Sequence, residues 1–311
     1  MELLYALEAI RSPFLDKVVA AITYLGSEIF FMAAALIVFW CVSKKCGYYL
    51  LSVGFSSILL NQFLKIICRV PRPWVLDPDF TIVESARAEA TGYSFPSGHV
   101  ANVTATLGAW GAYTKKKALR IVFAVIIVLV AFSRMYLGVH TPKDVFVSLG
   151  ITLVLVAAMY PLFRGGENDD KPTVFWAVGI LTVLSAAFLV FVSVHAWPAD
   201  VDAANLFEAH KSAWMLTMCG AAMFLSLWLD KKYIHFDVHA PLWAQIVKVA
   251  LGLALLLGIR AGLKPLFNLI FGPELAAFSS GLRYFFMVVF AAAVWPLTFR
   301  WFAAGCRRSK K

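Results

Sequence analysis

The most prominent feature of the sequence is a series of long apolar stretches separated by short polar segments. A transmembrane helix needs about 20 mostly apolar residues, and nine stretches approach or exceed this length. They are residues 18–42, 48–68, 98–114, 119–138, 143–163, 174–194, 212–230, 242–263 and 283–302. The pattern therefore predicts an all-α fold, a polytopic membrane helical bundle with about nine transmembrane helices.

A shorter apolar pattern precedes the first long stretch. Leu3, Leu7, Ile10 and Phe14 follow one another in steps of four, three and four, which places them on one face of a helix. We therefore expect an N-terminal interfacial helix that lies flat on the bilayer. Acidic residues occupy the region where a signal peptide would be basic, so we expect no signal peptide here.

The composition agrees with a membrane protein. Hydrophobic residues make up 61% of the chain and charged residues 15%, against roughly 45–50% and about 25% in soluble domains. This excludes a soluble globular protein. The net charge of +10 does not by itself indicate a nucleic-acid partner, because an excess of Lys and Arg in a membrane protein reports orientation first.

Basic residues are distributed unequally between the two sets of predicted loops. The loops after the first, third, fifth and seventh spans, with the C-terminal tail, hold fifteen, and the opposite loops hold eight. These counts leave out Lys248 and Arg260, which lie within a span, and Lys65, Arg72 and Arg134, which belong to the polar clusters described below. The positive-inside rule then predicts an extracytoplasmic N-terminus and a cytoplasmic C-terminus. We expect the protein in the cytoplasmic membrane of a bacterium.

The first polar cluster, at the end of the second span, contains Lys65 and Arg72. Pro71 and Pro73 end the helix and stiffen the turn. Two cations held in this way suit a phosphate or another oxyanion. Anchoring of lipid headgroups is an equally good interpretation of this cluster alone.

The second cluster, Pro96-Ser97-Gly98-His99, opens the third span. A helix N-terminus presents unpaired backbone N–H groups, and glycine allows an anion to approach them closely. Such a turn can bind phosphate, although Pro-Ser-Gly is also ordinary helix-capping chemistry.

The acidic loop 74–95, which precedes this turn, is the expected lid or selectivity element.

The third cluster joins Ser133-Arg134 to His140, Thr141 and Asp144. With Thr141 as N-cap, Asp144 falls in the first helical turn and could accept the Nδ1–H of His140. This would fix the tautomer and leave Nε2 as a nucleophile. The alternative is a helix-capping aspartate beside an incidental histidine.

Taken in order, the three clusters resemble the three-part signature of the type 2 phosphatidic acid phosphatase and haloperoxidase superfamily, in its integral-membrane branch. The resemblance covers roughly residues 60–150. It implies a phosphatase in which His140 forms a phosphohistidine, Asp144 orients His140, and His99 acts as acid and then base. The phosphate-binding groups that it implies are Lys65, Arg72, Arg134, Ser97 and the backbone N–H of Gly98.

The resemblance also limits the substrates. Membrane members of the superfamily act mostly on lipid phosphates or diphosphates, such as undecaprenyl diphosphate, phosphatidylglycerol phosphate or phosphatidic acid. The nine-span layout and residues 72–77 are similar to glucose-6-phosphatase, so a soluble sugar phosphate is an alternative. A transporter or flippase of polyprenyl phosphates is a further alternative, but binding alone needs no pair of histidines.

Two expectations complete the sequence prediction. No carboxylate cage for a metal is evident, so we expect a metal-independent enzyme with no cofactor. Its expected partners are membrane lipids and the phosphate ester substrate, and we expect no nucleic acid among them. The polar segment 164–173 separates a catalytic membrane core, residues 1–163, from an accessory four-helix membrane region, residues 174–311.

Overall fold

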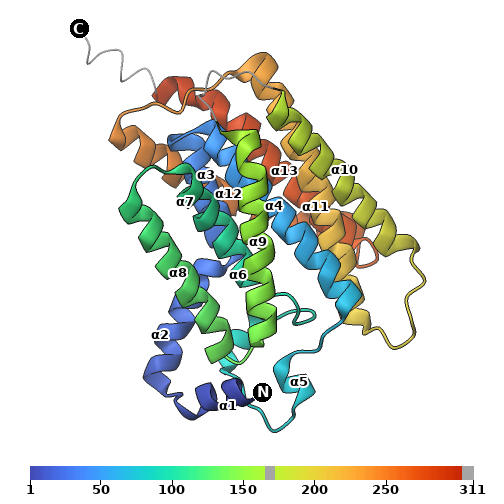
Figure 1. The fold of residues 1–311 in the computed structure, drawn as a ribbon. Helices are drawn as coiled ribbons and strands as arrows, with labels where there is room; N and C mark the ends of the chain where they lie inside the picture. The colour runs from blue at the N-terminus through green and yellow to red at the C-terminus, as the bar shows by residue number, and fades with distance from the viewer. Residues whose placement is uncertain (165–171, 303–311) are drawn as a thin grey trace. The chain divides into compact units, whose positions relative to one another are not determined.

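The computed structural model describes residues 1–164 and 172–302, and within them every regular element is a helix (Figure 1). The main helices are α1 (Glu2–Ala9), α2 (Pro13–Thr23), α3 (Glu28–Cys41), α4 (Lys44–Cys68), α5 (Pro73–Leu76), α8 (Lys117–Tyr136), α9 (Pro142–Phe163), α10 (Thr173–Val194), α11 (Ala203–Leu229), α12 (Leu242–Phe271) and α13 (Ala276–Val289). The predicted all-α membrane fold is confirmed. Of the predicted linker 164–173, residues 165–171 lie outside the described chain.

Seven helices in the described chain are long and apolar enough to cross a membrane. An eighth span is possible if Pro13–Gly26 and Glu28–Cys41, which meet at a bend of 48°, cross together. The predicted count of nine is therefore not confirmed. This bent pair covers the predicted first span, residues 18–42, and the remaining difference lies in the predicted third span, residues 98–114.

The helix in this region consists of α6 (Gly98–Val103), a π-helical turn η3 (Thr104–Gly108) and α7 (Ala109–Tyr113). It ends where Thr114 adopts an extended conformation, just before the basic loop. These segments have 6, 5 and 5 residues, and at about 1.5 Å per residue the helix is about 24 Å long. A bilayer core is roughly 30 Å thick, so this helix falls short of a full span.

The predicted N-terminal interfacial helix is also corrected. The helix α1 ends at Ala9, and a separate helix begins at Pro13 with Ser12 as its N-cap. The predicted apolar face is therefore divided between two helices, because Pro13 cannot continue the first one. The side chains of Leu4 and Leu7 are buried.

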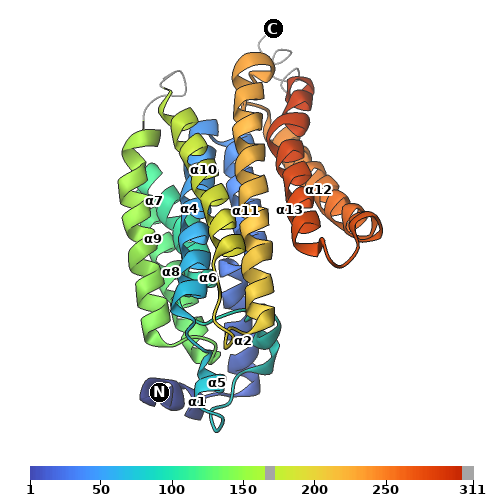
Figure 2. The same cartoon turned by 90° about the vertical axis from the view of Figure 1, so that its right-hand side faces the viewer.

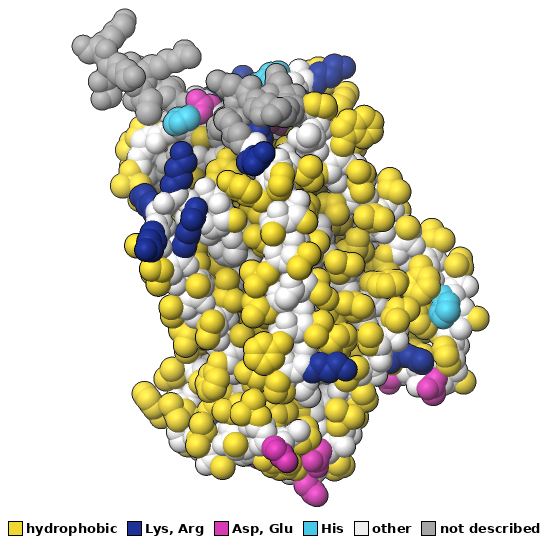
Figure 3. Space-filling model, in the orientation of Figure 1, with side chains coloured by type: hydrophobic (Ala, Val, Ile, Leu, Met, Phe, Trp, Pro, Cys, Tyr) yellow, Lys and Arg dark blue, Asp and Glu magenta, His cyan; other side chains and the backbone are white. Residues whose placement is uncertain are grey.

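The backbone contacts divide the chain into two compact units. The first consists of Met1–Ala34, Tyr49–Pro161 and Asp200–Leu206, and the second contains the rest of the described chain. In the first unit, α4 and α9 run side by side (Figures 1 and 2), and the hydroxyl of Tyr49 donates to the carbonyl of Val156 at 2.6 Å. The helix α9 exposes large apolar side chains such as Phe146 and Val154, and Figure 3 shows a face covered largely by hydrophobic side chains.

Near the N-terminus, two segments of the first unit lie unusually close together. The short turn η1 (Tyr24–Gly26) packs against α6, and a Cβ atom on Gly26 would lie 2.8 Å from the carbonyl oxygen of His99. Only glycine permits this distance without a shift of the backbone. The amide of Asn102 donates to the carbonyl of Gly26 at 3.3 Å and reinforces the contact.

In the second unit, α12 and α13 pack against each other (Figure 2). The fully buried Lys248 donates to the carbonyl of Trp40 at 2.8 Å and lies 4.3 Å from the centre of the Phe299 ring. The indole of Trp40 in turn donates to the carbonyl of Ala291 at 2.8 Å. These bonds tie residues 35–48 to the last helices.

Candidate active site

The three polar clusters of the sequence meet in the first unit. Lys65 lies in the last turn of α4, Arg72 is the N-cap of α5, and Arg134 lies in the last turn of α8. The remaining predicted site residues, Ser97, Gly98, His99, His140 and Asp144, lie at or near the first turns of α6 and α9.

Arg72 contacts His140 directly. Its Nη1 lies 3.0 Å from Nε2 of His140 and donates to the carbonyl of Val139 at 2.9 Å. The other two nitrogens donate to the carbonyls of Gly92 and Thr91. A guanidinium can only donate, so Nε2 of His140 is the acceptor. The proton of the neutral imidazole is therefore on Nδ1.

His140 and Asp144 are both buried, with exposed fractions of 2% and 1%. Nδ1 of His140 and Oδ2 of Asp144 are 3.5 Å apart, which is beyond the usual 2.7–3.2 Å of an N–H···O bond. Oδ2 also accepts the backbone N–H of Thr141 at 2.8 Å. The predicted pair is thus in contact, but at a separation longer than a normal hydrogen bond.

The electrostatic surroundings keep His140 neutral. Burial lowers its pKa well below the ordinary value, and the nearby positive charges of Arg72, Arg134 and Lys65 lower it further. Desolvation and like charge both disfavour the imidazolium. Nε2 is therefore unprotonated at neutral pH, and its lone pair faces Arg72.

Ser94 is a site residue that the sequence analysis missed. Its hydroxyl donates to Oδ2 of Asp144 at 2.6 Å and lies 3.4 Å from Nδ1 of His140. The side chain is fully buried. Its only signal in the sequence is a position three residues before Ser97, which does not distinguish it from other loop serines.

Two of the predicted phosphate-binding side chains have unused donors. Arg134 is 1% exposed, and its Nη1 donates to the hydroxyl of Thr23 at 2.7 Å. Its Nε and Nη2, and the hydroxyl of the fully buried Ser97, have no hydrogen-bond partner among the described residues. Such groups are costly to bury unpaired, and a guanidinium edge and a hydroxyl are both donors suited to an anion.

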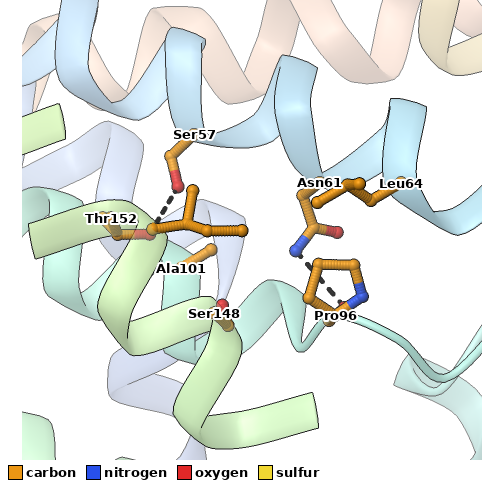
Figure 4. Close-up of a pocket in the computed structure, with 8 residues that line it drawn as sticks. Ser57, Asn61, Leu64, Pro96, Ala101, Ser148 and Thr152 are labelled. Atoms are coloured by element: carbon orange, nitrogen blue, oxygen red, sulfur yellow. Dashed lines mark hydrogen bonds between the residues drawn. The ribbon is translucent and has the colours of Figure 1, made fainter. Parts of the chain in front are cut away.

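The turn that carries Ser97 is held from α4 and α9 (Figure 4). Asn61 donates to the carbonyl of Pro96 at 3.3 Å, and the Ser148 hydroxyl donates to the carbonyl of Ser97 at 2.7 Å. The backbone N–H of Ser97 donates to the carbonyl of Asp144 at 3.2 Å. A Cβ on Gly98 would meet no atom within 4 Å, so the start of α6 is open to an approaching group.

Lys65 is the third predicted cation. Its ammonium group donates to the carbonyl of Tyr93, next to Ser94. Lys65 and Arg72 together therefore bind three successive carbonyls, those of residues 91–93. These bonds set the path of the chain that leads to Ser94.

His99 has a different partner. Its Nε2 lies 2.9 Å from Oε2 of Glu89, a half-exposed residue at the end of the segment η2 (Glu84–Glu89). Burial, with the charge of Arg134, lowers the pKa of His99 to about 4, although Glu89 opposes this shift. An ionised carboxylate only accepts, so Nε2 of His99 carries a proton.

Comparison with known proteins identifies the family. Residues 45–166 match the PAP2 superfamily, and residues 215–307 match the transmembrane extension of PAP2 superfamily phosphatases. Phosphatidylglycerophosphatase B of Bacillus subtilis is 31% identical over 177 residues, which are 52% of this chain and 80% of that protein. The chain belongs to the PAP2 superfamily. The resemblance inferred from the three clusters is confirmed.

Other PAP2 relatives are matched over a smaller share of their length. A probable sphingosine-1-phosphate phosphatase of Dictyostelium discoideum is 27% identical over 250 residues, 73% of this chain and 57% of that protein. An undecaprenyl-diphosphatase of Sulfolobus acidocaldarius is 31% identical over 112 residues, 36% of this chain and 52% of that protein. The chain thus spans little more than half the length of these two relatives. No solved structure matches it.

Proposed function

We propose that this protein is an integral-membrane phosphatase that hydrolyses the phosphate monoester or diphosphate of a lipid through a phosphohistidine on His140. The observation that carries the proposal is the buried, neutral His140, whose Nε2 accepts from Arg72. The unpartnered donors of Arg134 and Ser97 in the same unit support a phosphate site. Phosphoryl transfer requires mainly positioning and charge stabilisation.

In the first step, the phosphate enters between the donors and displaces Arg72 from His140. The lone pair of Nε2 attacks phosphorus, and the P–O bond to the lipid breaks. His99 gives a proton to the departing oxygen. The negative charge of the phosphate offsets the charge of Arg134, which favours the protonated form of His99.

In the second step, a water molecule attacks the phosphorus of the phosphohistidine. His99 takes the proton of this water, the P–N bond breaks, and inorganic phosphate leaves with His140 restored. Splitting the reaction into two displacements lowers the barrier of each one. Lys65, Arg72, Arg134, Ser97 and the N–H of Gly98 hold the phosphate oxygens in both steps.

The proposed charge stabilisation comes from the protein itself. The three cations and the first turn of α6 supply the positive charge that a divalent metal supplies in other phosphatases. We therefore propose a metal-independent reaction. Activity that disappears with a chelator and returns with Mg²⁺ would refute this part.

Two observations support a lipid substrate. The relatives described above are named as phosphatases or diphosphatases of lipids. In addition, Val75 and Leu76, which follow Arg72 on α5, are 61% and 53% exposed, so apolar side chains lie next to the proposed phosphate site. We further propose that the site faces outward from the bacterial cytoplasmic membrane, that residues 1–163 form the catalytic core, and that residues 174–311 are accessory.

The test is phosphate release by the detergent-purified protein. The panel contains undecaprenyl diphosphate, phosphatidylglycerol phosphate, phosphatidic acid, sphingosine 1-phosphate and glucose 6-phosphate, each with and without vanadate. We expect vanadate-sensitive release from at least one lipid and none from glucose 6-phosphate. Release from the sugar phosphate alone would instead support the soluble substrate, and vesicle uptake without hydrolysis would support a transporter.

A further inference from the structure

We propose that the hydroxyl of Ser94 is a positioning group that acts through Asp144 to fix the tautomer of His140. The inference rests on the proposed function, since it concerns the nucleophile of that reaction. Three atoms carry it: Oγ of Ser94, Oδ2 of Asp144 and Nδ1 of His140. The shortest contact among them, 2.6 Å, joins Ser94 to Asp144.

The direction of each bond follows from the chemistry of the groups. An ionised carboxylate has no proton to give, so the hydroxyl proton of Ser94 points to Asp144. The lone pairs of Oγ are then free to face Nδ1–H, which lies 3.4 Å from Oγ and 3.5 Å from Oδ2. The imidazole N–H therefore faces two acceptors, and Ser94 holds them in one arrangement.

The other groups around His140 cannot replace Ser94 and Asp144 as acceptors for its Nδ1–H. Arg72 faces Nε2 and only donates, while Arg134 and Lys65 contribute positive charge. The backbone N–H of Thr141 occupies the same Oδ2 at 2.8 Å and steadies the carboxylate, but it offers nothing to Nδ1. Within the described chain, the acceptors near Nδ1 are Ser94 and Asp144.

Ser94 also links the first cluster to the third. Its backbone N–H donates to the carbonyl of Val70 at 2.8 Å, and Lys65 binds the carbonyl of the preceding Tyr93. The chain that follows α4 therefore places the hydroxyl beside Asp144. The side chain is fully buried, so bulk water cannot take over the bond if the hydroxyl is removed.

The main test is a double-mutant cycle on the full-length protein with the best lipid substrate. Ser94→Ala should lower kcat by about 10–100-fold, the range found when the hydrogen-bond partner of a metal-ligating residue is removed, and should leave KM within about threefold. Because Ser94 acts through Asp144, adding Asp144→Asn should cost much less than the product of the two single effects. Ser94→Thr, which keeps the hydroxyl, should recover most of the lost kcat.

Ser56→Ala is the matched control. This buried serine donates to the carbonyl of Ser52 within α4, so its variant should keep the wild-type kcat and should combine with Asp144→Asn multiplicatively. The inference is wrong if Ser94→Ala hydrolyses lipid at the wild-type rate, or if its effect multiplies fully with that of Asp144→Asn. If the wild type releases phosphate from no substrate of the panel, it is the proposed function that fails.

Discussion

The two histidines of the candidate site differ in their hydrogen-bond partners and in their exposure. His140 is buried, and its Nε2 accepts from Arg72. His99 is 13% exposed, and its Nε2 donates to Glu89 on a surface segment. The hydrogen-bond partners of the two histidines therefore suit them to different roles. Nε2 of His140 has a lone pair, as a nucleophile requires, and Nε2 of His99 carries a proton, as an acid requires.

The surroundings of the two imidazole rings also differ in how deeply they are buried. His140 lies among Arg72, Ser94 and Asp144, all of which are buried. The partner of His99, Glu89, is 41% exposed and lies at the end of the surface segment η2. A buried nucleophile and a less buried acid suit a reaction in which His99 must give a proton and then take one.

The largest effect should come from removing the nucleophile. His140→Asn cannot form a phosphohistidine, and we expect phosphate release to fall by about 10⁴-fold or more. The measurement is lipid phosphate hydrolysis together with acid-labile labelling of the protein by ³²P substrate. Wild-type hydrolysis by this variant would show that His140 has no covalent role.

The next largest effect should come from His99→Ala. General acid–base catalysis contributes about 10²–10⁴-fold, and the loss should affect the breakdown of the phosphoenzyme as well as its formation. We therefore expect slow hydrolysis with a labelled protein that persists after a chase. His239→Ala is the control, because that exposed histidine pairs with Asp237 at 2.6 Å in the other unit, and it should not change the rate.

Arg134 distinguishes phosphate binding from histidine chemistry. Arg134→Lys keeps a positive charge but loses the guanidinium edge whose Nε and Nη2 are unpartnered. We expect KM to rise and kcat/KM to fall by about 10–100-fold, since each charge-assisted hydrogen bond contributes roughly 1.5–3 kcal/mol. An unchanged KM for substrate and an unchanged inhibition constant for vanadate would exclude Arg134 from phosphate binding.

The sequence predicted the members of this site better than their partners. Its clusters identified Arg72, His140 and Asp144, which the fold brings into contact, because motif spacing reflects the chemistry of the family. Ser94, Glu89 and Thr23 were not predicted as partners. Their positions depend on the path of the loop 77–97 and on the packing of α2 against α8, and neither follows from local patterning.

In the fold, too, the sequence predicted some features and missed others. Apolar length correctly indicated the long membrane helices, because a bilayer imposes a minimum length on a span. It failed at residues 98–114, where the helix ends before the basic loop, and at Pro13, which divides the N-terminal pattern. In both places a backbone break, rather than hydrophobicity, decides the structure.

The smallest predicted effect concerns the partner of His99. Glu89 raises the pKa of His99 against the larger opposing effects of burial and Arg134, which together bring it to about 4. Glu89→Gln removes this negative charge, so the pKa of His99 should fall further. The protonated form needed in the first step would then be lost at a lower pH, and the basic limb of the kcat/KM profile should move to lower pH.

At neutral pH this shift should lower kcat/KM by about three- to tenfold, because one pKa unit corresponds to a factor of ten. Glu84→Gln is the matched control, since Glu84 lies on the same segment but pairs with Arg87 at 2.6 Å, and its pH profile should coincide with that of the wild type. A basic limb that moves to higher pH in Glu89→Gln would mean that Glu89 competes with the substrate for His99 rather than supporting its protonation. In that case the exposure of the pair formed by His99 and Glu89, and not the proton affinity of His99, would be the property that separates the two histidines.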